Sequence, residues 1–361
     1  MILIVTLNKS VSHVGATYAL IASLLFGAST PFAKALMEHM APQVLAGLLY
    51  AGSGLGLLAL FLLRARTAPA ESNHLERKDL PWLIGAILFG GILAPVLLMV
   101  GLAHTPASTA SLLLNMEGVL TALLAWFVFK ENYDRRIMLG MGFIIVGGVL
   151  LSWQQGHATA IPWSAIAIIG ACLGWAIDNN LTRKVSSSDA VQIAGIKGLV
   201  AGIVNLGIAA LLGNTMPSLG SASAAMLVGF CGYGVSLVLF VLALRHIGTA
   251  RTGAYFSTAP FIGVIVAFVL LHESPNGLFW GAALFMGVGV WLHLSEHHEH
   301  SHVHEALTHS HSHTHDEHHQ HTHDFVWNGK EPHVHLHRHE RLEHSHAHFP
   351  DVHHQHRHDP T

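Results

Sequence analysis

The segment Gly101–Glu131, GLAHTPASTASLLLNMEGVLTALLAWFVFKE, is followed later in the chain by a similar segment, Ala243–Glu273, which reads ALRHIGTARTGAYFSTAPFIGVIVAFVLLHE. The two segments align without a gap at an offset of 142 residues, so that Glu131 matches Glu273. Each contains a mainly apolar run of the length, about 20 residues, that a helix needs to cross a bilayer. The sequence therefore predicts a membrane protein with an internal repeat.

The composition of the whole chain agrees with a membrane location. Of its 361 residues, 51% are hydrophobic and 11% are charged, whereas soluble domains carry about 25% charged residues. The two cysteines, Cys172 and Cys231, lie inside apolar segments, which argues against a disulfide framework or a CxxC metal site. The net charge of −3 favours no nucleic-acid partner. Without a nucleotide-binding motif or a catalytic constellation, we expect neither an ATP-driven pump nor an enzyme.

Ten apolar stretches of membrane-spanning length follow one another along the chain. Five of them belong to each copy of the repeat, and an odd number forces the two copies to cross the membrane in opposite senses. Inverted repeats of this kind are typical of secondary transporters, whose substrate site lies near the midplane between the halves. The predicted spans are about 14–36, 42–63, 81–102, 107–129, 136–153, 162–184, 189–212, 221–244, 249–271 and 276–294.

The basic residues indicate the orientation of these spans, because cytoplasmic loops collect lysine and arginine. If the N-terminus is cytoplasmic, the outer connections hold only one basic residue, Lys34. With ten spans, both termini are then cytoplasmic, and the protein is a multi-pass protein of the cell (cytoplasmic or inner) membrane. The inner loops and helix ends would hold Lys9, Arg64, Arg66, Arg77, Lys78, Lys130, Arg135, Arg136, Arg183, Lys184 and Arg245.

The predicted fold is an all-α membrane protein of ten transmembrane helices, arranged as two inverted five-helix repeats. A short cytoplasmic N-terminus covers residues 1–13, and the two repeats cover residues 14–153 and 154–294. The remaining residues, 295–361, form a histidine-rich tail that we expect to be disordered and cytoplasmic.

The two copies resemble the drug/metabolite transporter superfamily, specifically its EamA-domain branch. The first copy carries the resemblance in Leu114–Leu123, LNMEGVLTAL, which is similar to the family's LEPVxTAL stretch, and in the helix-ending Glu131. The second copy carries it in Ser257–Gly263, STAPFIG, and in Glu273. The glycine-rich fifth span of each copy is similar too.

One position departs from the family pattern: Gly118 stands where the family often has proline, while the second copy keeps Pro260. The resemblance covers about residues 14–294 and leaves the tail outside. It implies a secondary transporter, most often one of small organic solutes.

Glu117 is the clearest candidate for a functional side chain, because it lies about halfway along the fourth predicted span. Ionisable groups at this depth are costly and are usually functional. Glu117 would bind a proton or a cation during transport; the alternative is a carboxylate permanently paired with a neighbouring helix. Its counterpart in the second copy is Ala259, so the fold itself does not require an acid here.

Asp178, Asn179 and Lys197 are further candidates for the transport pathway. Asp178 and Lys197 lie at similar depths on consecutive spans, so they could pair; alternatively, Asp178 forms a helix-end bridge with Arg183. Lys197 could instead extend toward the cytoplasm. Asp178 and Thr182 are four residues apart and share a helix face.

Lys34 and Arg251 complete the pathway residues proposed from the sequence. Lys34 follows a Gly27–Pro31 break that would suit a kinked gate, although an interfacial lysine at a helix end is the simpler interpretation. Arg251 and Tyr255 are four residues apart and could line the cavity. For Glu131 and Glu273, at helix ends, capping or turn roles are favoured.

The tail suggests a metal, because 24 of the 32 histidines lie between His297 and His358. Imidazole suits Zn²⁺, Ni²⁺ and Co²⁺, and closely spaced histidines can bind a metal without a fixed scaffold. The alternative is a low-complexity extension without a selected function. No cofactor is required for transport, but the tail could bind Ni, Zn or Co through two His-x-His runs: His309, His311, His313 and His315, then His333, His335, His337 and His339.

Three functions follow from these observations. The first is a secondary, proton-coupled exporter of a divalent metal ion, or a transporter that metal regulates; the second is an exporter of amino acids or other small organic metabolites. The third is a membrane metal store or sensor. The expected partners are membrane lipid and a small-molecule or metal-ion substrate, with a homodimer as an alternative to a monomer.

Overall fold

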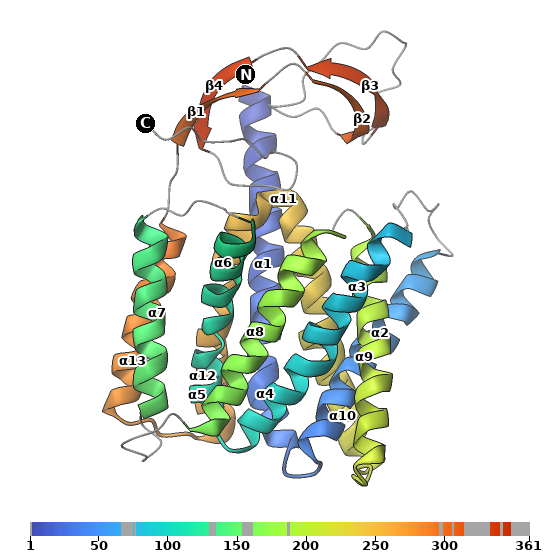
Figure 1. Cartoon of the computed structure of the whole chain (residues 1–361), viewed down its shortest axis with the longest axis vertical. Helices are drawn as coiled ribbons and strands as arrows, with labels where there is room; N and C mark the ends of the chain where they lie inside the picture. Colours follow the sequence, from blue (N-terminus) through green and yellow to red (C-terminus); the bar gives the residue numbers. More distant parts are fainter. Residues whose placement is uncertain are drawn as a thin grey trace. The chain divides into compact units, whose positions relative to one another are not determined.

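The computed structural model describes residues 2–65, 75, 77–129, 135–153, 162–185 and 188–295, together with four short segments between residues 299 and 347 (Figure 1). Its first unit is helical. The helices are α1 Ile2–Leu36, α2 Pro42–Ala65, η1 Arg77–Asp79, α3 Leu80–Ala86, η2 Ile87–Leu93, α4 Ala94–Ala103, α5 Ala107–Leu113, α6 Met116–Phe129, α7 Arg135–Trp153, α8 Trp163–Arg183, α9 Ala190–Leu211, α10 Leu219–Gly229, η3 Phe230–Val235, α11 Ser236–Phe256, α12 Ala259–Leu271 and α13 Gly277–Leu294.

Eight helical segments of the described chain are long and apolar enough to cross a membrane. Two shorter apolar helices, α12 and α13, follow them and occupy the region of the last two predicted spans. The multi-pass, all-helical character of this unit is therefore confirmed. The count of ten spans remains a prediction.

The helices run between two ends of the bundle. The Lys34 end holds the end of α1, the turn from α4 to α5 and the start of α8, where the His104 and Trp163 rings lie 4.8 Å apart (lower in Figure 1). The opposite end holds the end of α8, and we call it the Lys184 end. These two names are used below.

Helix α11 reverses direction within its own bounds. The Ser236 hydroxyl donates to the Ala22 carbonyl at 2.8 Å, while the Thr258 hydroxyl, just past the end of α11, hydrogen-bonds to Ser23 at 2.7 Å. A straight helix would place residues 236 and 258 about 33 Å apart. Both nevertheless contact neighbouring residues of α1, so the chain must double back between them, as the predicted boundary between the eighth and ninth spans requires.

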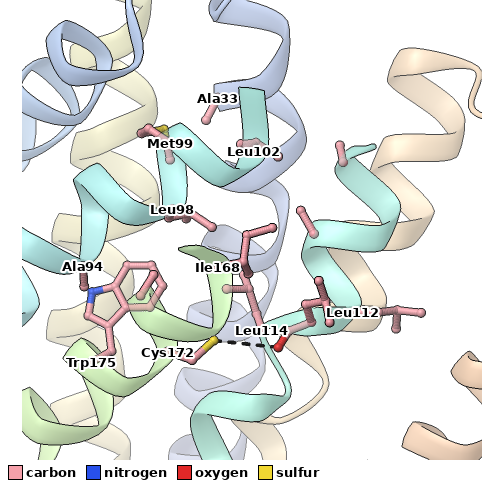
Figure 2. Packing of buried hydrophobic residues seen from close by; sticks show 14 of the residues in the cluster. Ala33, Ala94, Leu98, Met99, Leu102, Leu112, Leu114, Ile168, Cys172 and Trp175 are labelled. Carbon is pink, nitrogen blue, oxygen red and sulfur yellow. Dashed lines mark hydrogen bonds between the residues drawn. The ribbon is translucent and has the colours of Figure 1, made fainter. Parts of the chain in front are cut away.

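The core lies where small residues let helices approach closely. The strongest pairings are α2 with α9, α1 with α11, and α7 with α13. A methyl group added at Gly198 of α9 would lie 2.6 Å from the Gly54 nitrogen of α2, so this crossing tolerates only glycine. Figure 2 shows the buried face of α8, where the Cys172 thiol lies 3.7 Å from the Leu113 carbonyl at the end of α5.

The second unit, within residues 297–350, contains four strands. The strands β1 Glu299–His304 and β4 Leu342–Ala347 pair antiparallel, as do β2 Leu307–His313 and β3 His333–His339. The predicted disorder of the tail is not confirmed for these segments. Histidine at every second position has the two-residue period of a strand, so the same pattern that suggested a flexible metal ligand is also compatible with strand pairing.

Candidate substrate pathway

Two transmembrane helices are interrupted inside the bundle. A two-residue turn interrupts the α-helical hydrogen bonding at Leu114–Asn115, between α5 and α6, and again at Ser257–Thr258, between α11 and α12. The backbone of Leu114, Ser257 and Thr258 stays in the right-handed helical region. At each break a polar side chain donates a hydrogen bond to a backbone carbonyl of the preceding turn. The Asn115 amide donates to the Leu112 carbonyl at 3.0 Å, and the Thr258 hydroxyl donates to the Tyr255 carbonyl at 2.7 Å. Such side-chain bonds compete with the helix and favour a local break.

A narrow cavity lies beside both breaks. It is too narrow to hold a water molecule. The Ser111 hydroxyl is buried there without a hydrogen-bond partner among the described residues. The cavity is lined by Phe26, Gly27, Thr30, Ser111, Leu114, Ala259 and Pro260.

Glu117 lies in the first turn of α6, and its carboxylate accepts a hydrogen bond of 2.9 Å from the Asn179 amide of α8. Asn179 is exposed although it lies within a predicted span, and so is the neighbouring Gly118, beside which a methyl group would meet nothing within 4 Å. Glu117 therefore adjoins positions that the described part of the chain does not cover. Among the described residues, the side chain that hydrogen-bonds to Glu117 is the neutral amide of Asn179.

Asp178, the residue before Asn179, has a charged partner. Its carboxylate lies 2.5 Å from the Lys197 ammonium of α9 and accepts a hydrogen bond of 2.8 Å from the Thr182 hydroxyl. Asp178 and Lys197 retain only 7% and 6% of their exposure. Of the alternatives considered from the sequence, the structure therefore forms the pair with Lys197, and Lys197 does not extend toward solvent. The Arg183 side chain lies outside the described residues.

Gly90 makes room for this ion pair. A methyl group added at Gly90 would lie 1.9 Å from the Asp178 carboxylate, so only glycine fits. Gly90 lies in the π-helical segment η2, which leaves its carbonyl free to accept bonds from the Tyr50 hydroxyl at 2.8 Å and the Trp175 indole at 3.0 Å. Sequence reasoning missed these side chains, although the Gly90-Gly91 pair inside an apolar span was a usable signal.

Aromatic rings surround the same region. The Phe26 ring of α1 lies 6.1 Å from Trp175, 5.9 Å from Tyr233 and 5.3 Å from Phe256. Phe26 also lines the narrow cavity. The wall beside the helix breaks is therefore apolar and aromatic, and polar groups enter it from α6 and α8.

The other residues proposed from the sequence do not join this group. Lys34 lies at the Lys34 end, where its ammonium donates to the Leu102 and Ala103 carbonyls at 2.6 and 3.1 Å. The carboxylate of Glu273 caps the start of α5 there, in agreement with the favoured capping role. Arg251 belongs to α11, but its side chain lies outside the described residues, as does all of Glu131.

The described residues hold no group of three or more histidine, cysteine, aspartate or glutamate side chains that could bind a metal. The metal ligands predicted in the tail are not tested by this finding. His315 lies outside the described residues, and the side chains of the other seven, on β2 and β3, lie outside them too.

The comparisons with known proteins agree with this helical, pathway-like architecture. The chain is 30% identical over 286 residues to a transporter of Methanothermobacter thermautotrophicus, covering 75% of this chain and 83% of that protein. It is 25% identical over 236 residues to a probable terminal-alkyne amino-acid exporter of Streptantibioticus cattleyicolor, covering 63% of this chain and 79% of the relative. It is also 23% identical over 300 residues to a probable amino-acid metabolite efflux pump of Salmonella typhimurium, covering 76% and 93%.

A solved crystal structure shares the fold, with a TM-score of 0.56 at 17% sequence identity, over 78% of this chain and 95% of that one. The model of the EamA-like transporter family matches the chain twice, over residues 13–153 and 162–295. The two matches cover most of the chain and both of the similar halves. The protein is a member of the EamA-like transporter family, within the drug/metabolite transporters.

Proposed function

We propose that the protein is a proton-coupled exporter of a small organic solute that carries an ammonium group, such as an amino acid or a related metabolite. The observation that carries this proposal is the contrast between two acids on facing helices. Asp178 is buried and neutralised by Lys197, whereas Glu117 beside it has a neutral amide partner and adjoins positions that the described part of the chain does not cover.

The charge balance of the site favours a cationic group as the ligand of Glu117. Lys197 cannot bind an anionic group of the substrate while it is paired with Asp178, because breaking this buried ion pair would leave two uncompensated charges. Glu117 is left as the carboxylate that an ammonium group or a proton would neutralise. Exchange of the two at one carboxylate couples them, since they cannot occupy it together.

The apolar surroundings suit the rest of an organic solute. Phe26 and its aromatic neighbours offer a ring-lined wall next to the helix breaks. A hydrated metal ion gains nothing from such a wall. Two relatives, described as a probable terminal-alkyne amino-acid exporter and a probable amino-acid metabolite efflux pump, support the same substrate class.

The architecture behind this proposal is the pair of inverted five-span halves, with both termini in the cytoplasm. Two features recur within one residue of the repeat offset and support it: the π-helical segments η2 and η3, and the breaks after α5 and α11. Discontinuous helices near the midplane are where secondary transporters bind their substrates. In this orientation the Lys34 end is extracellular and the Lys184 end is cytoplasmic.

Proteoliposomes that contain the full chain test the proposal. A pH gradient should drive uptake of radiolabelled amino acids, chosen from a panel that includes neutral, acidic and basic members. Glu117→Gln should abolish the gradient-driven component, because the amide cannot exchange a proton for an ammonium group. Glu38→Gln, the same change at an exposed acid in the α1–α2 turn, serves as the matched control and should transport normally.

Equal gradient-driven uptake by the wild type and Glu117→Gln would overturn the role of Glu117. A wild-type chain that moves none of the panel but lowers cellular nickel, cobalt or zinc would overturn the organic substrate. The metal measurement uses cells that express the full chain, a chain ending after Ser295, and Glu117→Gln.

A second candidate function, regulation of transport by metal, is favoured by the strand register of the tail. The pairing of β2 with β3 places residue 309 opposite 337, 311 opposite 335 and 313 opposite 333, and all six are histidines. Isothermal titration with Zn²⁺ or Ni²⁺, on the full chain and on the chain ending after Ser295, tests it. Equal metal binding by the two chains would refute it.

A further inference from the structure

The turn that joins α4 to α5 is held from both sides by charged residues of other helices. At the end of α4, the Lys34 ammonium donates to the last two carbonyls, Leu102 and Ala103. At the start of α5, the Glu273 carboxylate accepts from the Ala107 and Ser108 amides at 2.6 and 2.9 Å, and from the Ser108 hydroxyl at 2.5 Å. A cation at a helix C-terminus and an anion at an N-terminus are the favourable pairings with the helix dipoles.

The cap of α5 comes from the opposite half of the protein. The N-cap residue Pro106 provides no side-chain bond of its own, so the first amides of α5 depend on Glu273. Glu273 follows His272, whose φ of 53° and ψ of 34° lie in the left-handed region. Residues other than glycine adopt this conformation uncommonly, although histidine does so more often than most, and here the turn brings the carboxylate back to α5.

The capped helix closes one side of the pathway. All residues of α5 from Ala107 to Leu113 are buried, and the narrow cavity beside Ser111 is too tight for a water molecule. A methyl group at Gly263 of α12 would lie 2.6 Å from the Ser111 hydroxyl, and one at Gly27 of α1 would lie 2.2 Å from the Ala259 carbonyl. Substrate cannot leave Glu117 toward the Lys34 end unless α5 separates from α1 and α12.

The opposite side is open at the matching positions. Gly253 and Tyr255, the counterparts of Ser111 and Leu113 at the offset of 142, are exposed. A methyl group at Gly253 or at Gly118 would meet nothing within 4 Å. We call the Lys34-end side, where these positions are buried, the closed side, and the other, where described protein does not cover them, the open side; the cap of α5 belongs to the closed side.

The geometry points to Glu273 as the latch of the extracellular gate: its bonds to Ala107 and Ser108 hold the pathway closed at the Lys34 end and must break before substrate can leave there. The extracellular assignment rests on the orientation given under the proposed function. The latch itself does not depend on which solute is carried. Glu273 is a positioning residue, because it acts through α5 and not on the substrate.

Cysteine accessibility tests the latch without a substrate. In a full chain with Cys172→Ala and Cys231→Ala, Ser111→Cys places a nearly isosteric thiol in the narrow cavity. A membrane-impermeant thiol reagent is applied to intact cells and, separately, to inside-out vesicles. With Glu273 present, labelling from outside should be slow. Glu273→Ala removes three charge-assisted bonds and should accelerate it roughly tenfold or more.

Two milder variants keep the test decisive if Glu273→Ala does not reach the membrane. Ala107→Pro deletes one donor at the first helical position, where proline is well tolerated, and Pro106 already has the ψ of 143° that a residue before proline prefers. Ser108→Ala deletes the hydroxyl bond. Each should accelerate labelling from outside by less than Glu273→Ala, and Glu273→Asp should restore part of the slow labelling.

Glu38→Gln is the matched control, since it removes an exposed acid from the same end of the bundle. It should leave the labelling rate unchanged. The latch is refuted if the Glu273, Ala107 and Ser108 variants all label from outside at the parental rate. Faster labelling only in inside-out vesicles would refute the extracellular side of the gate. If the labelling results support the latch but Glu117→Gln still transports normally, only the proposal about the substrate and Glu117 is wrong.

Discussion

The two sides of the proposed pathway are built from aligned segments of the repeat, but they differ in structure. On the closed side, Ser111 and Leu113 are buried against α1 and α12. On the open side, their counterparts Gly253 and Tyr255 are exposed. The closed side is held by close helix packing and by charged helix caps, whereas the open side has a buried ion pair in its wall. The difference shows that similar halves can adopt unlike packing within one chain.

The largest expected effect lies in the wall of the open side. Asp178→Asn leaves the buried Lys197 ammonium without its counter-charge, which should lower the free energy of unfolding by about 3–5 kcal/mol. The double variant Asp178→Leu with Lys197→Met removes both charges and should recover most of that loss. Thermal unfolding in detergent, followed by tryptophan fluorescence, measures both. A single variant as stable as the wild type would show that this pair does not stabilise the open side.

The next effect concerns the packing of the closed side. Gly27→Ala places a methyl group 2.2 Å from the Ala259 carbonyl, and separating α1 from α12 should cost about 1–3 kcal/mol. The same variant should also accelerate labelling of Ser111→Cys from the Lys34 end. A free energy of unfolding equal to that of the wild type, together with slow labelling of Ser111→Cys, would contradict the view that close packing seals this side.

A smaller effect is expected from the cation that caps α4. Lys34→Met removes the donor to Leu102 and Ala103 and should lower the free energy of unfolding by about 1 kcal/mol. Lys34→Arg retains the positive charge and the hydrogen-bond donors, so it should lower the free energy of unfolding by less. If the methionine and arginine variants unfold at the same temperature, the cap contributes nothing measurable to the closed side.

The smallest effect is expected at the glycines of the open side. Gly118→Ala and Gly253→Ala add a methyl group where nothing lies within 4 Å, and alanine favours the helix by up to about 1 kcal/mol. Stability should stay equal or rise slightly, and transport should persist. A loss of stability as large as that of Gly27→Ala would show that these positions are closely packed. The contrast between the two sides would then disappear.

The sequence located the candidate acids better than it predicted their partners, and their role in transport stays a prediction. Glu117, Asp178, Asn179 and Lys197 were all visible as polar residues inside apolar spans, and the similar depth of Asp178 and Lys197 suggested their pairing. Spacing along a chain cannot show which neighbouring helix faces a side chain. Only the structure shows that Asn179 donates to Glu117.

Other features gave weak signals or none. The capping role favoured for Glu273 is confirmed, but its partner, α5 of the other half, lies more than 160 residues away. The π-helical segment that presents the Gly90 carbonyl to Tyr50 and Trp175 has no sequence pattern of its own. In the tail, the two-residue histidine period is shared by flexible chains and by strands, so composition favoured disorder where the structure pairs β2 with β3.

By itself, the sequence determined the membrane class, the repeat and the family, because hydrophobic length and residue spacing are local properties that the bilayer constrains directly. Tertiary structure decided which charges meet and which side of the pathway is closed. Those outcomes depend on contacts between segments far apart in the chain, such as Glu273 with Ser108 and Gly27 with Ala259. Ser111 and Leu113 align with Gly253 and Tyr255, and packing against α1 and α12 buries only the first pair.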